Sequence, residues 1–261
     1  MRRILVFLLL CAAIPSAAGS RDSLSRAASV ETFRPCRLAV PAAVFTAGAV
    51  GVNWNWYAEN INIPIKDYAS GLRSQWGGTK VDNYIQYIPV VSYVALGACG
   101  LGEYSFMEQL AVCACAYATM GALTNALKYT VCEMRPDGSA RNSFLSGHSA
   151  TAFMGAELVR LEFGNWIGAG AYAIATATAL LRVYNCRHWF GDLLGGAGIG
   201  ILSARVGYWL LPLERRVLNG VFGTDLALAP FVGTVPATGL SAGSPSASYP
   251  AACGLSCSLR F

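Results

Sequence analysis

Five long apolar stretches dominate the central part of this 261-residue chain and limit the folds open to it. None of them alternates between apolar and polar residues, and their lengths favour helices over strands. Only 13% of the residues are charged, against about 25% in an average soluble domain. The sequence therefore predicts an all-α fold, a membrane-embedded bundle of about five to six helices. The stretches that would form it are residues 87–102, 106–127, 149–163, 165–184 and 189–212.

The N-terminal part is predicted to hold an export signal, a linker, a short apolar helix and a loop. Residues 1–19 begin with a basic pair and continue with an apolar core and small residues, which indicates a signal peptide or an uncleaved signal anchor. Residues 20–86 follow. Within them, residues 38–52 are apolar but short for a membrane span, which needs about 20 residues. Residues 53–86 are predicted to be an exposed loop with one amphipathic turn region.

Residues 87–212 are predicted to be the helical catalytic core, and residues 213–261 a C-terminal tail. In the tail, residues 225–233 are compatible with a strand, and residues 254–261 alternate between apolar and polar side chains. The tail is therefore predicted to be a short β-hairpin or otherwise irregular.

Eight cysteines remain outside the signal, and their spacing matches no zinc-binding pattern. Cys132 and Cys186 lie in loops that the predicted fold brings to one face. An exported protein can form a disulfide between them, but two free thiols are an equally good interpretation. Pairing of Cys253 with Cys257 is also left open.

The only two histidines of the chain, His148 and His188, both lie in patterns suited to binding phosphate. His148 follows Ser146 and Gly147, and His188 lies between Arg182 and Asp192. A third pattern upstream is Lys128-x6-Arg135-Pro136. Alternating helix directions place all three patterns at the same end of the predicted bundle. This convergence distinguishes them from scattered structural histidines.

The chemistry of these residues predicts a phosphotransfer site. The cationic side chains of Lys128, Arg135 and Arg182 can neutralise a phosphate dianion without a metal or cofactor. The backbone amides of Ser146 and Gly147, at a helix N-terminus, favour anions. One imidazole can attack phosphorus while the other protonates the leaving oxygen.

These patterns resemble the three motifs of the type 2 phosphatidic acid phosphatase (PAP2) and haloperoxidase superfamily, and the surrounding residues resemble its exported Bacteroides-type membrane members. The resemblance covers residues 128–192. It implies that His188 is the nucleophile, that His148 is the general acid and that Asp192 orients His188. It also implies phosphate binding by Lys128, Arg135, Ser146, Gly147 and Arg182, with no metal and no cofactor.

Two positions depart from the family pattern. Leu145 stands where the family has proline, and Leu181 where it has serine. Proline would stiffen the turn that enters the helix, and serine would offer one more hydrogen bond beside Arg182. Because every charge and both imidazoles remain, weakened rather than abolished chemistry is expected.

The function expected from the resemblance is removal of phosphate from a lipid monoester or diphosphate through a phosphohistidine. Candidate substrates are phosphatidic acid, phosphatidylglycerol phosphate, polyprenyl diphosphate and the phosphates of lipid A. Alternatives are a broad periplasmic acid phosphatase, a vanadate haloperoxidase, and a degenerate member kept as an envelope binding protein.

The expected partners are the lipid substrate and membrane lipid, with no nucleic acid and no known protein partner. The net charge of +5 is too modest for a nucleic-acid surface. The expected location is the inner membrane, with the active site facing the periplasm.

Overall fold

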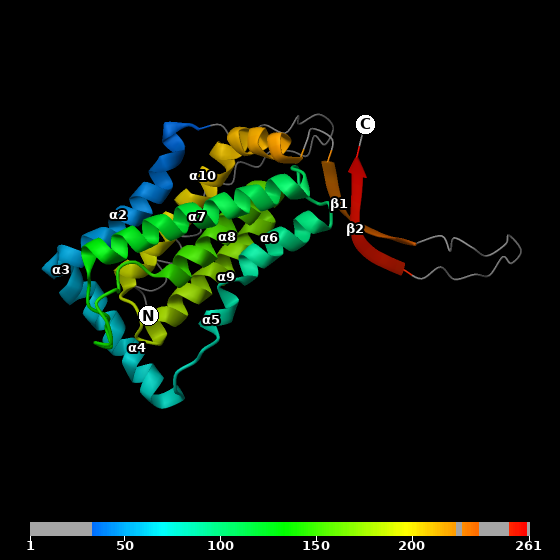
Figure 1. Ribbon diagram of the computed structural model, residues 1–261. Helices are drawn as coiled ribbons and strands as arrows, with labels where there is room; N and C mark the ends of the chain where they lie inside the picture. Colours follow the sequence, from blue (N-terminus) through cyan, green and yellow to red (C-terminus); the bar gives the residue numbers. More distant parts are fainter. Residues whose placement is uncertain (1–32, 223–225, 235–250, 260–261) are drawn as a thin grey trace, which may run out of the picture.

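The computed structural model describes residues 33–222, 226–234 and 251–259, and these residues form a helical bundle followed by a small hairpin (Figure 1). The predicted signal at residues 1–19 lies outside the described residues. The helical elements before the bundle core are η1 (Pro35–Leu38), α2 (Ala39–Asn53), α3 (Asn55–Tyr57), the π-helical turn η2 (Ala58–Asn62), α4 (Ile63–Trp76) and α5 (Asp82–Ile85). The later helices are α6 (Ile88–Ala98), α7 (Phe106–Val131), α8 (Gly147–Phe163), α9 (Asn165–Tyr184) and α10 (Phe190–Phe222).

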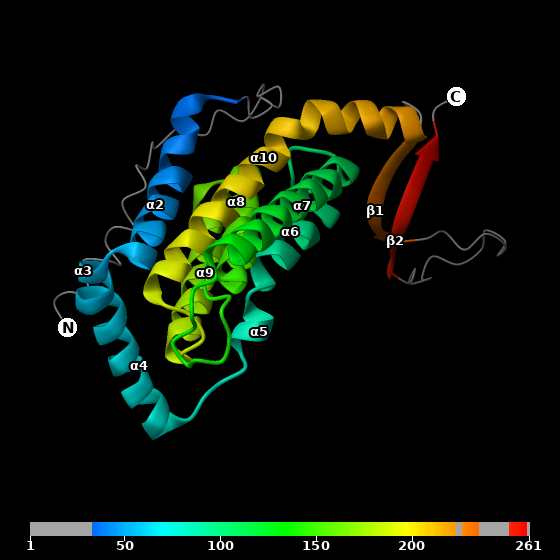
Figure 2. The ribbon, with the colours of Figure 1, turned by 60° about the vertical axis from the view of Figure 1, so that its left-hand side comes forward.

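Helix α8 is the central helix of the bundle. Figures 1 and 2 both show it among α6, α7, α9 and α10. Most of its side chains are buried, and Met154, Leu158 and Val159 belong to the main apolar core. The core therefore surrounds α8, and both ends of α8 are held in place by its neighbours.

Helix α10 approaches α8 closely because glycine faces the contact. A methyl group added at Gly196 would lie 2.5 Å from the carbonyl oxygen of Ser146, just before α8. On another face, a methyl group at Gly48 of α2 would lie 2.3 Å from the backbone nitrogen of Gly195. Small residues let helix backbones approach in this way, and they fix the start of α8 against α10.

Four helical segments among the described residues are long and apolar enough to cross a membrane: Pro35–Val52, Phe106–Val131, Asn165–Tyr184 and Phe190–Leu218. The first corrects the expectation that residues 38–52 are too short for a span, because the turn η1 extends α2 at its N-terminal end. By contrast, α6 has only 11 residues. It is shorter than the expected 87–102 helix because the chain turns at Gly100, which has a positive φ of 72°.

The prediction of an exposed loop over residues 53–86 was wrong. Most of this segment is helical, and α4 packs on α9 through Ala69, Ala179 and Val183. The helical period of α4 was hard to recognise because aromatic and polar residues are mixed within it. Gly77, with a φ of 76°, ends the helix, and an extended stretch then leads to α5.

The C-terminal hairpin was predicted. Strand β1 (Leu226–Thr234) pairs antiparallel with β2 (Ala251–Leu259), with Leu226 opposite Leu259 and Thr234 opposite Ala251. The hairpin follows α10 at the end of the bundle opposite α4 and α5 (Figure 2). Helix α10 itself continues through Pro212 to Phe222, so the first residues of the predicted tail are helical.

The bundle interior also holds two buried carboxylates, each well bonded. Glu157 of α8 accepts hydrogen bonds from Arg160, Arg205 and the Tyr172 hydroxyl. Glu162, one turn further on, accepts from Gln109 and from the Tyr208 hydroxyl. These bonds join α7, α8, α9 and α10. They compensate for taking polar groups out of water.

Candidate active site

The Ser-Gly-His turn lies where α8 begins. Ser146 is the N-cap, and its hydroxyl accepts a hydrogen bond from the backbone N–H of Ser149 at 3.4 Å. The N–H of Ser146 donates to the carbonyl of Asp192 at 3.1 Å. This amide is therefore engaged within the protein, and phosphate binding by Ser146 stays a prediction. The amides of Gly147 and His148 are the first two of the helix, so they have no intrahelical acceptor and remain available to an anion.

His188 lies just before α10 and is almost fully buried, with 3% of its surface exposed. Its Nδ1 is 2.9 Å from the carbonyl oxygen of Ser143 and 3.4 Å from Oδ2 of Asp192. A carbonyl oxygen only accepts, so the proton of a neutral ring lies on Nδ1. Nε2 then keeps its lone pair, which is the state that a nucleophile needs. Burial lowers the pKa of His188, which favours this neutral form.

Asp192 is held by three groups on one side of its carboxylate. Its Oδ2 accepts from the Ser143 hydroxyl at 2.5 Å and from the Trp189 N–H at 2.8 Å, and it lies beside the ring of His188. Ser143 therefore contacts both His188 and Asp192. Sequence reasoning missed it, although it lies only three residues before Ser146.

Three cationic side chains gather beside these histidines. Lys128 lies within electrostatic range of Arg135, Arg182 and Asp192. A methyl group on Gly147 would lie 3.9 Å from Nζ of Lys128, so the ammonium faces the start of α8. The Nε atoms of Arg135 and Arg182 are buried without a hydrogen-bond partner in the described part of the chain. Buried donors of this kind normally have partners, and an anion between the two arginines would supply one.

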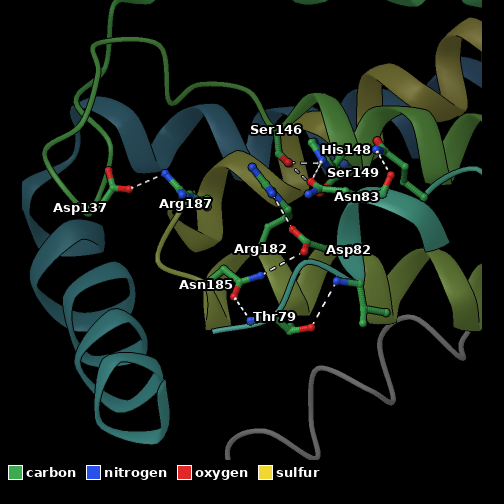
Figure 3. Close-up of polar contacts among 12 residues, drawn as sticks. Thr79, Asp82, Asn83, Asp137, Ser146, His148, Ser149, Arg182, Asn185 and Arg187 are labelled. Carbon is green, nitrogen blue, oxygen red and sulfur yellow. Dashed lines mark hydrogen bonds and ion pairs between the residues drawn. The ribbon is translucent and has the colours of Figure 1, made fainter. Parts of the chain in front are cut away.

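Arg182 is oriented by Asp82 of α5, a residue that sequence reasoning missed. Its Nη1 donates to Oδ2 of Asp82 at 2.5 Å, and Nδ2 of Asn185 donates to the other carboxylate oxygen at 3.1 Å. Asn185 in turn accepts from the N–H of Thr79. Figure 3 shows Asp82 between Arg182 and Asn185. The stretch before α5 is thereby attached to the end of α9, and nothing in the sequence pattern indicated this long-range contact.

His148 contacts the same short helix. Its Nε2 lies 2.9 Å from Oδ1 of Asn83 (Figure 3). Burial and the charge of Arg182 lower the pKa of His148 to about 4, although Asp82 opposes the shift. The ring is therefore neutral at neutral pH. A bound phosphate dianion would raise its pKa and so favour the protonated form that a general acid requires.

A further carboxyl group, Glu133, lies in the loop after α7 and faces Asp192. Burial and the nearby Asp192 carboxylate raise the pKa of Glu133 to about 9. Its Oε2 is buried with no hydrogen-bond partner in the described residues. Glu133 is therefore protonated at neutral pH and adds no negative charge beside Asp192. Sequence reasoning did not single it out.

The two departures from the expected motifs have different surroundings. Leu145 is fully buried, and it packs with Phe144 against Gly195 of α10. Leu181 is only half-buried.

The thiols of Cys132 and Cys186 are both free, which agrees with the unpaired alternative.

Comparison with known proteins gives three matches. The family model described as the PAP2 superfamily matches residues 109–216. The lipid A 1-phosphatase of Porphyromonas gingivalis is 40% identical over 147 residues, which are 54% of this chain and 33% of that protein. The chain thus matches about a third of the length of this relative. The crystal structure of the first transmembrane PAP2 type phosphatidylglycerolphosphate phosphatase from Bacillus subtilis matches with a TM-score of 0.48 at 22% identity. That match covers 69% of this chain and 97% of the solved one.

Proposed function

We propose that this chain, whose residues 109–216 match the family model of the PAP2 superfamily, is a phosphatase that removes phosphate from a membrane lipid through a phosphohistidine on His188. The observation that carries the proposal is the state of that ring. Nδ1 bonds the Ser143 carbonyl, which leaves Nε2 unprotonated beside three cationic side chains.

The first half of the proposed reaction forms a phosphorus–nitrogen bond. Nε2 of His188 attacks phosphorus, and the bond from phosphorus to the leaving oxygen breaks. The leaving oxygen takes its proton from His148. Lys128, Arg135 and Arg182 bind the non-bridging oxygens, with the amides of Gly147 and His148, and stabilise the charge that develops on them. Asp192 stabilises the imidazolium form of His188.

The second half reverses these roles. His148, now neutral, takes a proton from water as the water oxygen attacks phosphorus. The phosphorus–nitrogen bond breaks, and inorganic phosphate leaves with His148 protonated again. Nδ1 of His188 keeps its proton throughout. The cycle therefore needs one acid–base group and one nucleophile, and three fixed cations perform the charge neutralisation for which other phosphatases use metal ions.

Three observations support a lipid as the substrate. Four helical segments are apolar and long enough to cross a membrane, the site lies at the end of this bundle, and exposed aromatic residues such as Trp76 and Tyr129 lie on elements at that end. Aromatic side chains at this level are typical of the membrane interface. The similarity to a lipid A 1-phosphatase makes the 1-phosphate of lipid A the first candidate. The proposed location is the inner membrane, with the site open to the periplasm.

The test is phosphate release by the full chain, purified in detergent and assayed in EDTA. The panel contains lipid A, phosphatidic acid, phosphatidylglycerol phosphate, a polyprenyl diphosphate and one soluble aryl phosphate. We expect release from a lipid that is lost in His188→Ala. Trapping of labelled phosphate on the wild-type protein, and its absence from His188→Ala, would identify the intermediate.

Each alternative function gives a different result in this assay. Equal activity on the aryl ester would indicate a broad acid phosphatase. Activity that requires a metal would contradict the proposed chemistry. Lack of release from every ester, with folded protein shown by thermal unfolding, would contradict the proposal and favour a binding role.

A further inference from the structure

Asn83 lies beside one ring nitrogen of His148. Its Oδ1 lies 2.9 Å from Nε2 of His148. An amide oxygen can only accept a hydrogen bond, so Nε2 is the nitrogen of His148 that carries the proton. That proton points at the side chain of Asn83.

This contact locates the leaving group. A general acid must lie within hydrogen-bond distance of the atom that it protonates. In the proposed reaction Nε2 of His148 protonates the leaving oxygen, which then lies within about 3 Å of Nε2, at the place of Oδ1 of Asn83. The carbon skeleton attached to that oxygen then lies beside Asn83.

We propose that the carboxamide of Asn83 gives way to the leaving oxygen and then binds a second oxygen of the leaving group. This inference rests on the proposed function and adds a substrate class to it. The preferred substrates are phosphate esters of sugars or other polyols, in which a hydroxyl or ring oxygen adjoins the reacting oxygen.

The surroundings of Asn83 allow this movement. Asn83 itself is exposed, so its side chain can rotate out of the way. Its neighbour Asp82 is buried and bonded to Arg182 and Asn185, and the Asn83 carbonyl accepts from Nε2 of Gln86. The backbone of α5 therefore stays in place while the side chain of Asn83 turns.

An ester with an apolar leaving group cannot offer Asn83 a new hydrogen bond in place of the one to His148. Its oxygen breaks the bond between His148 and Asn83, and the amide of Asn83 then finds no second oxygen on the substrate. A polyol ester restores a bond to this amide. A site built to bond a substrate oxygen discriminates against an analogue that lacks this oxygen. We therefore expect kcat/KM to differ between polyol esters and esters with an apolar leaving group, and this difference should depend on Asn83.

The experiment compares two lipids in the detergent-purified full chain. One is lipid A with its 1-phosphate, in which the leaving group is a sugar, and the other is dodecyl phosphate, in which it is a simple alcohol. For Asn83→Ala we expect kcat/KM on lipid A to fall about three- to tenfold, the value of one hydrogen bond. On dodecyl phosphate it should stay the same or rise. Asn60→Ala, which removes an exposed amide on another element, is the matched control and should change neither.

Every outcome bears on the proposal. A fall in kcat/KM of equal size on both lipids would mean that Asn83 only holds His148 in place. An unchanged kcat/KM on both lipids would mean that Asn83 does not line the site. Either result would overturn the inference while leaving the proposed function intact. Wild-type protein that releases phosphate from neither lipid would overturn the proposed function and this inference with it.

Discussion

At the scale of single residues, the ring of His188 is held from two sides. The Ser143 carbonyl takes the shorter contact with Nδ1, and the Asp192 carboxylate lies 3.4 Å away. The backbone thus sets which nitrogen carries the proton. In the proposed reaction the carboxylate stabilises the charge that appears on the ring during attack. Because Ser143 also bonds Asp192 through its hydroxyl, one residue links both supports.

The first prediction concerns the hydroxyl of Ser143. Ser143→Ala keeps the carbonyl but removes the hydrogen bond to Asp192, and bonds to charged groups are worth about 1.5–3 kcal/mol. We expect kcat to fall about tenfold or more with little change in KM, because the phosphate ligands are untouched. Ser74→Ala, which removes an exposed hydroxyl from α4, is the control. A rise in KM with kcat unchanged would contradict this role.

The second prediction concerns Glu133 and pH. Its pKa is raised to about 9 from an ordinary value of 4.5. The folded protein therefore keeps a proton that the unfolded chain loses between these values, so stability falls as pH rises through that window. Glu133→Gln has no such proton, and its melting temperature should rise relative to wild type between pH 5 and pH 9. The measurement is thermal unfolding across this range.

A matched variant controls this pH experiment. Glu103→Gln removes an exposed carboxyl group on a different loop, and its melting temperature should follow that of wild type. Parallel curves for wild type and Glu133→Gln would show that Glu133 does not hold a proton in the folded state.

The sequence predicted the residues of the site better than their contacts. The spacing of Lys128, His148 and His188 was enough to place them at one end of a bundle. It did not reveal Asp82 or Asn83, because these reach the site across more than 60 residues of chain. Nor did it show that the amide of Ser146 is taken by Asp192. Spacing within a motif fixes local geometry, whereas long-range hydrogen bonds depend on how the elements pack.

At the scale of elements, α5 shows how four residues can matter more than their length suggests. Four residues are too few for a helix that is stable on its own, since isolated helices need about 12 residues or more. Its position comes from tertiary bonds to α9 and from its contact with the start of α8. A short element held in this way supplies two side chains to the site. The sequence in this region reads only as a polar loop.

The third prediction concerns the contact between α8 and α10. In Gly196→Ala the new methyl group would meet the Ser146 carbonyl at 2.5 Å, so the Ser-Gly-His turn must shift. Overpacking costs about 1–3 kcal/mol, and a shifted catalytic turn lowers kcat. We therefore expect a lower melting temperature together with at least a tenfold loss of kcat.

Gly170→Ala is the matched control for this contact. Gly170 lies in α9, and a methyl group there would meet nothing within 4 Å. Alanine favours a helix over glycine by about 1 kcal/mol, so stability should stay the same or rise slightly. Equal losses in the two variants would show that the close approach at Gly196 is not what limits the site.

At the scale of the whole molecule, the buried carboxylate of Glu157 joins three helices. It is 1% exposed and is the shared acceptor for Arg160, Arg205 and Tyr172. The fourth prediction is that Glu157→Ala lowers stability by about 3–5 kcal/mol, since it removes one side of a buried ion pair. Thermal unfolding in detergent measures this, with Glu59→Ala, an exposed carboxyl group, as the control. A change below about 1 kcal/mol, the usual value of an exposed pair, would contradict the prediction.

The central place of α8 has a consequence for how the protein is made. This helix carries His148, Glu157, Arg160 and Glu162, and it is not among the candidate spans found in the described residues. Charged side chains at mid-membrane cost about 2.5–3.5 kcal/mol each during insertion, so α8 cannot enter the lipid by itself. Arg205, one of the partners that neutralise it, belongs to α10, which is synthesised later. We therefore expect α8 to enter the bilayer only after α10 has been synthesised, and a nascent chain stopped before residue 205 should leave α8 outside the bilayer.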